Sequence, residues 1–217
     1  VFEMYSPAFQ MEEILNRFNV LRFSPNFELY VDFNRRFITE LKYFSDLVEM
    51  YSIDEAFLDL NFFIINYTEY GLLIKDTILR HLDLPVGIGI APTKALCKVA
   101  SKIAKTFIEK TKGVYAIDTE ERRVKALKWI KIEDVWGIGR QFARKLQSMK
   151  ILNAFQFTQL SDSWVLKNMT VVGLRLKKEL EGVSCLSLSE VNDPKKEIGT
   201  AKAFGSMLSD YELIKEA

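Results

Sequence analysis

Two short apolar runs with adjacent acidic residues between them, Asp54 and Glu55, constrain the fold of this chain more than any other feature. The runs occupy 48–53 and 56–60 and are rich in β-branched, aromatic and aliphatic residues, so they predict two buried strands. The acidic pair then lies at or near the turn of a hairpin. Such a pair is usually an ordinary solvated turn, but carboxylates held at strand ends are also ligands that Mg²⁺ prefers. Asp54 and Glu55 are therefore candidate catalytic and metal-binding residues.

Apolar periodicity on both sides of this hairpin predicts helices packed on a sheet. The predicted helices have apolar residues every three or four positions and lie at 9–18, 26–44, 67–82 and 94–109. The other predicted strands are short and lie at 86–90 and 114–117. Asn26 and Thr93 stand where N-caps are expected. Strands interleaved with helices, several of them in hairpin register, predict an α+β fold with a mostly antiparallel sheet.

The strand pattern stops near residue 119, and short helices separated by Gly, Asn and Ser continue to about residue 183. This change predicts a second, all-helical domain. The following stretch, 184–196, is polar and contains Pro194, which is typical of a linker. We expect residues 201–207 to begin a third domain.

Charge is distributed unevenly along the chain, although the formal net charge is only +1. Residues 1–60 contain 11 acidic and 5 basic residues, whereas residues 94–152 contain 15 basic and 6 acidic residues. A basic block beside an acidic one suits a protein that attracts phosphates close to a metal site, although a charge run is more often a solvated face. The start of the chain does not resemble a signal peptide, and Cys97 and Cys185 lie far apart in sequence. We therefore expect a cytoplasmic protein with reduced thiols.

Three lysines of the predicted helix at 94–109 share one side of it. At about 100° per residue, Lys94 and Lys105 differ by about 20°, and Lys98 lies about 40° from Lys94. The pattern fits an ordinary amphipathic helix with a lysine-rich polar face, and it fits a cationic stripe that binds phosphate equally well. Periodicity alone leaves both interpretations open.

A Gly-Ile-Gly turn between two predicted helices is a candidate DNA-binding element. Gly137 and Gly139 let the backbone turn with positive φ while Ile138 packs inward. The amides at the start of the next helix then point outward and form a nest for a phosphate. The basic residues that would reinforce this nest are Arg140, Arg144 and Lys145. Such binding contacts the DNA backbone and not the bases, but the same turn can also be purely structural.

Residues 51–59, YSIDEAFLD, closely resemble the signature of the Y-family, or translesion, DNA polymerases. Matches at successive positions over such a length are hard to obtain by chance. The resemblance covers nearly the whole chain and includes residues 89–90 and 104–105 around the lysine helix. Trp136 before the Gly-Ile-Gly turn and CLSL at 185–188 favour the UmuC-like branch, which supplies catalytic subunits of DNA polymerase V.

The resemblance implies roles for the residues singled out above. Asp54 and Glu55 would be ligands of two catalytic Mg²⁺ ions. Lys105 would bind the triphosphate of the incoming deoxynucleoside triphosphate, and Lys98 would contact the DNA backbone. Residues 137–139 would form the helix-hairpin-helix of a thumb that grips primer-template DNA. The implied activity is DNA synthesis across damaged bases in the bacterial SOS response, with a UmuD-type subunit, the RecA filament and the sliding clamp as partners.

The family pattern also implies a domain order. We expect a remnant of the fingers, a palm, a thumb and a linker with the start of a little finger, at 1–22, 23–118, 119–190 and 191–217. The family begins with a strand that carries another metal-binding Asp, and this sequence lacks that pattern. The chain by itself should therefore be inactive. Two alternatives are a non-catalytic helix-hairpin-helix module with an inert acidic turn and a metal-dependent nuclease, which does not explain the match at 51–59.

Overall fold

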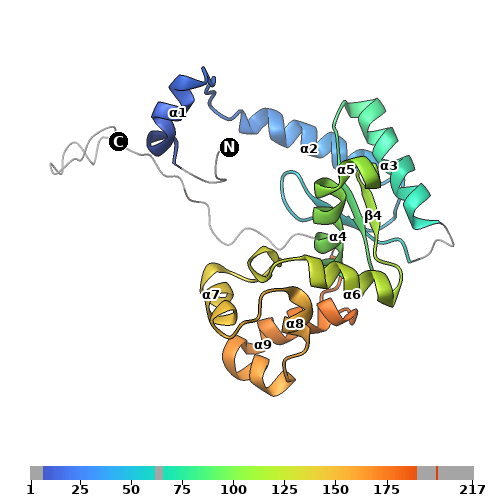
Figure 1. Ribbon diagram of the computed structural model, residues 1–217. Helices are drawn as coiled ribbons and strands as arrows, with labels where there is room; N and C mark the ends of the chain where they lie inside the picture. Colours follow the sequence, from blue (N-terminus) through green and yellow to red (C-terminus); the bar gives the residue numbers. More distant parts are fainter. Residues whose placement is uncertain (1–6, 62–65, 190–198, 200–217) are drawn as a thin grey trace.

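The computed structural model describes residues 7–61, 66–189 and 199 (Figure 1). The strands are β1 (Val48–Met50), β2 (Ala56–Leu58), β3 (Ile88–Ile90) and β4 (Val114–Ala116). The helices before β4 are η1 (Ala8–Met11), α1 (Glu12–Arg17), α2 (Phe27–Leu41), α3 (Tyr67–Leu82), α4 (Lys94–Thr106) and α5 (Ile108–Thr111). The helices after β4 are α6 (Glu120–Trp129), η2 (Ile132–Asp134), α7 (Arg140–Ser148), α8 (Ala154–Thr158) and α9 (Asp162–Glu181). Of the predicted linker and little-finger start at 191–217, only residue 199 is among the described residues. No described helix is long and apolar enough to cross a bilayer.

β1 and β2 pair antiparallel with Val48 opposite Leu58, which confirms the predicted hairpin. Helices α2 and α3 pack beside it, and the shared core consists of Leu41, Val48, Ile74 and Ile78. Asn26 is the N-cap of helix α2, as predicted, and its side chain accepts a hydrogen bond from the Leu29 amide at 3.1 Å. The predicted helix at 67–82 is also confirmed, with the bounds of α3.

β3 and β4 pair in parallel, with Ile88 opposite Val114, so the prediction of a mostly antiparallel sheet is wrong. The described strands form two separate pairs, one antiparallel and one parallel. The connection explains the difference: α4 and α5 return the chain to the end of the sheet where β3 began, so β4 runs in the same direction. At Gly89, a Cβ atom would clash with the backbone of Cys97 and Ser101. Glycine at this position therefore lets α4 lie directly against β3.

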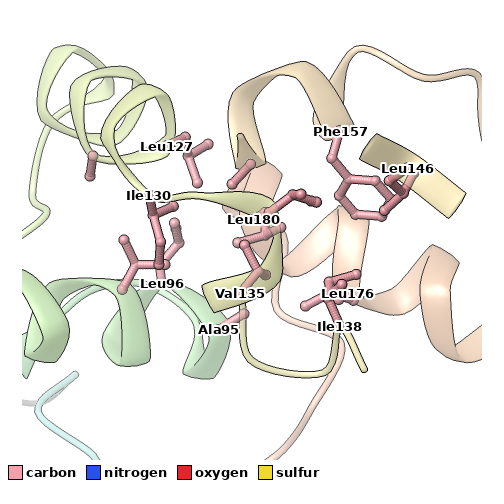
Figure 2. Packing of buried hydrophobic residues seen from close by; sticks show 14 of the residues in the cluster. Ala95, Leu96, Leu127, Ile130, Val135, Ile138, Leu146, Phe157, Leu176 and Leu180 are labelled. Carbon is pink, nitrogen blue, oxygen red and sulfur yellow. The ribbon is translucent and has the colours of Figure 1, made fainter. Parts of the chain in front are cut away.

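A hydrophobic core joins α4 to the helices that follow residue 119. Figure 2 shows Ala95 and Leu96 of α4 in the same cluster as Leu127, Ile130 and Leu180, all of them buried. Helix α4 packs against β3 and β4 and also against α6 and α9. In Figure 1 it lies between the blue-green part of the chain and the yellow-orange helices. The predicted helical region is confirmed in its elements, but it shares its core with α4.

The described part of the polar stretch after α9, residues 184–189, forms hydrogen bonds with the rest of the molecule. The fully buried Glu179 accepts hydrogen bonds from the amides of Cys185 and Leu186 at 2.6 and 3.0 Å. Its other carboxylate oxygen accepts from the amide of Ala95, in the first turn of α4, at 3.1 Å. One buried carboxylate thus joins α4, α9 and residues 185 and 186, so hydrogen bonds anchor this part of the predicted linker.

Candidate active site at the acidic hairpin

The turn between β1 and β2 carries both acidic residues, as predicted. The Ser52 amide donates to the Glu55 carbonyl oxygen at 3.1 Å, and the Ser52 hydroxyl donates to Asp54 Oδ1 at 2.6 Å. The Asn34 side chain of α2 donates to the Ile53 carbonyl oxygen at 2.8 Å. The turn is therefore held by its own backbone and by α2. Asp54 is exposed and Glu55 is partly buried.

A cavity of about 900 Å³ opens beside this turn. Its lining includes Asp54 and Glu55 from the turn and Lys98 and Lys105 from α4. A second hollow, of about 460 Å³, is also lined by Glu55, Lys98 and Lys105, and it extends to Trp136. The structure therefore brings Lys105 to the same cavity as the acidic pair.

The lysines of α4 have different surroundings, which the predicted stripe did not distinguish. Lys94 pairs with Glu49 of β1 at 2.7 Å, and Lys98 pairs with Glu55 at 2.6 Å. Lys105 is exposed and forms no salt bridge within the described part of the chain. The acidic hairpin thus compensates two of the three charges, and Lys105 remains available for an anion in the cavity.

Asp54 and Glu55 supply the oxygen donors that Mg²⁺ prefers. Among the described residues, no group of three or more Asp, Glu, His or Cys side chains is arranged to hold a metal ion. Mg²⁺ in phosphoryl-transfer sites is commonly bound through one or two carboxylates together with water and substrate phosphates. The acidic pair therefore fits part of a Mg²⁺ coordination shell.

The Gly-Ile-Gly turn connects η2 to α7. Gly137 has a φ of +88°, as predicted, whereas Gly139 has a φ of −75° and needs no special conformation. Ile138 is buried in the core, as predicted. Gly139 is the N-cap of α7 and offers no side-chain cap. The first amides of α7 are therefore directed toward whatever lies outside the turn.

The predicted basic residues of this region are all on α7 and exposed. Arg140 and Arg144 are one turn apart, so they share a face of the helix. Lys145 donates to Asn168 Oδ1 at 2.9 Å, and its ammonium lies 5.8 Å from the centre of the Trp164 ring. The two arginines therefore have more freedom to bind an anion than Lys145 has.

A contact that the sequence did not predict joins the acidic hairpin to the Gly-Ile-Gly turn. The indole N–H of Trp136 donates to the Tyr51 hydroxyl oxygen at 2.8 Å, and the ring centres are 5.7 Å apart. The two residues are 85 positions apart in the chain. No local pattern signals such a contact, because periodicity describes only neighbours along one element.

The two cysteines are unpaired, as predicted, and differ in exposure. Burial raises the pKa of the Cys97 thiol to about 11, and the nearby Glu179 carboxylate adds to this rise. Because the thiolate is the reactive form, only about one Cys97 thiol in a thousand is ionised at pH 8.

We expect a thiol-reactive disulfide reagent at pH 8 to modify Cys185 rapidly and Cys97 only after unfolding, as read by mass spectrometry. A Cys185→Ser variant should then show no rapid modification while folded. Fast labelling of Cys97 in that variant would contradict the raised pKa.

Comparison with known proteins agrees with these features. Residues 3–102 match the model of the impB/mucB/samB family. The chain is 38% identical over 213 residues to Protein UmuC of Salmonella typhimurium, an alignment that covers 97% of this chain and 50% of that protein. It is 31% identical over 217 residues to Protein MucB of Escherichia coli, covering 99% of this chain and 51% of MucB. The chain thus spans about half the length of these curated relatives.

The fold also matches solved polymerase structures. The insertion ternary complex of Dbh DNA polymerase matches with a TM-score of 0.67 and 24% identity, over 82% of this chain and 52% of that one. DinB from Sulfolobus solfataricus matches with a TM-score of 0.61 and 26% identity, over 79% of this chain and 50% of that one. By sequence similarity the chain is related to the impB/mucB/samB family, and it shares the fold of DNA polymerases of known structure.

Proposed function

We propose that this chain forms the palm and thumb of a polymerase that copies DNA across damaged bases. The observation that carries the proposal is the shared cavity, which is lined by Asp54 and Glu55 from the hairpin and by Lys105 from α4. Carboxylates for metal and a cation for phosphate are the parts that phosphoryl transfer requires. The proposed reaction joins the α-phosphate of a deoxynucleoside triphosphate to a primer 3′ hydroxyl, with pyrophosphate leaving.

Asp54 and Glu55 are the proposed ligands of two Mg²⁺ ions. When bound, such ions lower the pKa of the attacking hydroxyl and neutralise charge on the transferring phosphate. The bonds from Ser52 and Asn34 keep the acidic turn in place, so positioning of the carboxylates costs little reorganisation. Lys98 holds Glu55 at 2.6 Å and remains a second candidate for a DNA-backbone contact, because it lines both hollows.

Lys105 is the proposed contact of the triphosphate. Its aliphatic stem packs over Gly87, where a Cβ atom would lie 2.9 Å from Lys105 Cγ. Lys105 lines both hollows beside the acidic turn. A charge-assisted hydrogen bond to phosphate strengthens binding before the chemical step and during it.

A Lys105→Ala variant of the full-length protein is expected to raise the KM for the incoming nucleotide about tenfold, with a smaller change in kcat. Steady-state incorporation of a single nucleotide measures both constants. Lys110→Ala is the matched control, because Lys110 is an exposed lysine of the nearby α5 that lines neither hollow. Equal KM values for the two variants would remove Lys105 from the nucleotide site.

The Gly-Ile-Gly turn is the proposed helix-hairpin-helix contact with the duplex. The Ile138 amide donates to the Val135 carbonyl oxygen at 3.0 Å, so the amides proposed for phosphate are those at the start of α7, which follows its N-cap Gly139. Arg140, Arg144 and Lys145 add positive charge. Amides and basic side chains of this kind bind phosphate oxygens irrespective of sequence. A polymerase needs such contacts, because it must hold any primer-template.

An Arg144→Ala variant is expected to bind a primer-template duplex more weakly and to reduce the slope of log K against log salt concentration by about 1. The loss should be the same for duplexes of different sequence. Fluorescence anisotropy titrations between low and moderate salt give the slope. Arg80→Ala on α3 removes the same charge away from the turn and should leave the slope unchanged. A slope equally unaffected in Arg144→Ala would count against a phosphate contact there.

The same proposal includes the biological setting that the family implies. The polymerase would act in the bacterial cytoplasm during the SOS response, with a UmuD-type subunit, the RecA filament and the sliding clamp as partners. Its domains would follow the order fingers, palm, thumb and little finger, with boundaries near 22, 118 and 190. A non-catalytic DNA-binding module gives no reason for an acidic pair and an exposed lysine to line one cavity, so the polymerase is the better account.

A further inference from the structure

We propose that Trp136 is a positioning residue that transmits duplex binding at the Gly-Ile-Gly turn to the acidic turn through Tyr51. The inference rests on the proposed function and adds to it a physical link between the DNA contact and the metal ligands. Trp136 directly precedes Gly137, whose φ of +88° redirects the chain into the turn. Tyr51 lies three positions before Asp54. The two residues therefore stand at the bases of the two turns.

The contact between these residues combines a hydrogen bond with ring packing. The Trp136 indole N–H donates to the Tyr51 hydroxyl oxygen at 2.8 Å, and the rings meet edge to face with an interplanar angle of 79°. Phe57 of β2 completes the cluster, with its ring centre 5.6 Å from that of Tyr51 and 6.5 Å from that of Trp136. Trp136 therefore contacts both sides of the hairpin, and aromatic pairs of this geometry favour one relative orientation.

The cluster continues to a proposed metal ligand. The Lys98 ammonium lies 5.0 Å from the centre of the Tyr51 ring, a distance suited to a cation–π interaction. The same ammonium is 2.6 Å from Glu55 Oε2. A shift of the Tyr51 ring therefore changes the surroundings of Lys98, and through Lys98 it changes those of Glu55.

A second contact links α4 to the segment that precedes Trp136. Lys102 of α4 pairs with Asp134 of η2 at 2.8 Å, two residues before Trp136. Both side chains are about 40% exposed, so this pair contributes little by itself. The buried core between α4 and the later helices fixes the larger elements. The aromatic cluster is then the contact through which a local movement of residues 137–139 reaches the acidic turn.

The Tyr51 and Ser52 amides report on this coupling, because both donate to the Glu55 carbonyl oxygen at 3.0 and 3.1 Å across the turn. The experiment measures their hydrogen exchange by NMR in the 217-residue chain, with and without a saturating primer-template duplex. In the wild-type chain we expect the duplex to slow exchange at both amides about fivefold, the factor that one net hydrogen bond corresponds to.

Trp136→Phe retains a ring and removes the N–H, and Tyr51→Phe removes the acceptor from the other side. Each variant is expected to lose the duplex-dependent slowing while binding the duplex with an affinity within about twofold of wild type. The double variant should lose no more than either single variant. Trp129→Phe is the matched control, because it makes the same change in α6, where the Trp129 ring centre lies 5.4 Å from that of Phe107 and not in the cluster with Tyr51. It should keep the full slowing.

The outcomes separate this inference from the proposed function. If the wild-type chain binds the duplex and exchange at Tyr51 and Ser52 does not change, the coupling is refuted while DNA binding stands. The same holds if Trp136→Phe keeps the slowing. If anisotropy detects no binding of duplex by the wild-type chain, the proposed thumb contact is wrong, and the coupling is wrong with it.

Discussion

An Asp54→Asn substitution in the full-length protein is expected to reduce primer extension at least about a thousandfold, because an amide replaces a charged metal ligand. Affinity for the duplex should stay within about twofold, since Asp54 is not one of the proposed DNA contacts. The asparagine oxygen can still accept the Ser52 hydroxyl bond that Asp54 accepts at 2.6 Å, so the turn should keep its shape. Gel-based primer extension and anisotropy measure the two properties on the same preparation.

Asp46→Asn makes the same chemical change outside the site. Asp46 is exposed and precedes β1 without lining either hollow, so its variant should extend primers at the wild-type rate. An Asp54→Asn variant that extends primers as fast as this control would refute the ligand assignment. Loss of both extension and duplex binding would point instead to misfolding, which the unfolding midpoint of each variant detects directly.

A Glu179→Gln substitution is expected to lower the free energy of unfolding by about 3 kcal/mol, the largest effect on stability that we expect from one isosteric change. The fully buried carboxylate accepts three backbone amides, those of Ala95, Cys185 and Leu186. In glutamine, an NH₂ group replaces one oxygen and faces amide donors, so at least one backbone N–H loses its acceptor. For a chain of this size the midpoint of thermal unfolding should fall by about 6 to 12 °C.

Circular dichroism of the 217-residue chain measures this midpoint. Glu121→Gln changes an exposed acid in the first turn of α6 and should move the midpoint by less than about 2 °C. A Glu179→Gln midpoint equal to that of this control would mean that the buried carboxylate contributes no net stability. Limited proteolysis after residue 184 should also become faster in Glu179→Gln, because residues 185 and 186 lose their anchor.

Local pattern was sufficient for much of the first half of the chain. The apolar runs around Asp54 and Glu55 predicted the hairpin and its turn, and Asn26 and Thr93 cap helices as expected. These features depend on interactions between residues within a few positions of one another, so a short segment of sequence is sufficient to predict them. The YSIDEAFLD string at 51–59 likewise identified the family without any structure.

Long-range geometry was not accessible in this way. The parallel pairing of β3 with β4 depends on the route of α4 and α5, which periodicity does not describe. The three lysines of α4 look alike on a helical wheel, but Lys94 and Lys98 meet acids of the hairpin while Lys105 does not. Which charge stays available for a ligand depends on what packs opposite each side chain.

By itself, therefore, the sequence determined the elements, the acidic turn and the family. Tertiary structure alone decided that α4 shares a core with the later helices, that Glu179 anchors residues 185 and 186, and that Trp136 reaches Tyr51. Each of these contacts joins residues that are distant in the chain. Which residues meet in such contacts depends on burial and shape complementarity in the folded molecule, and local periodicity predicts neither of these properties.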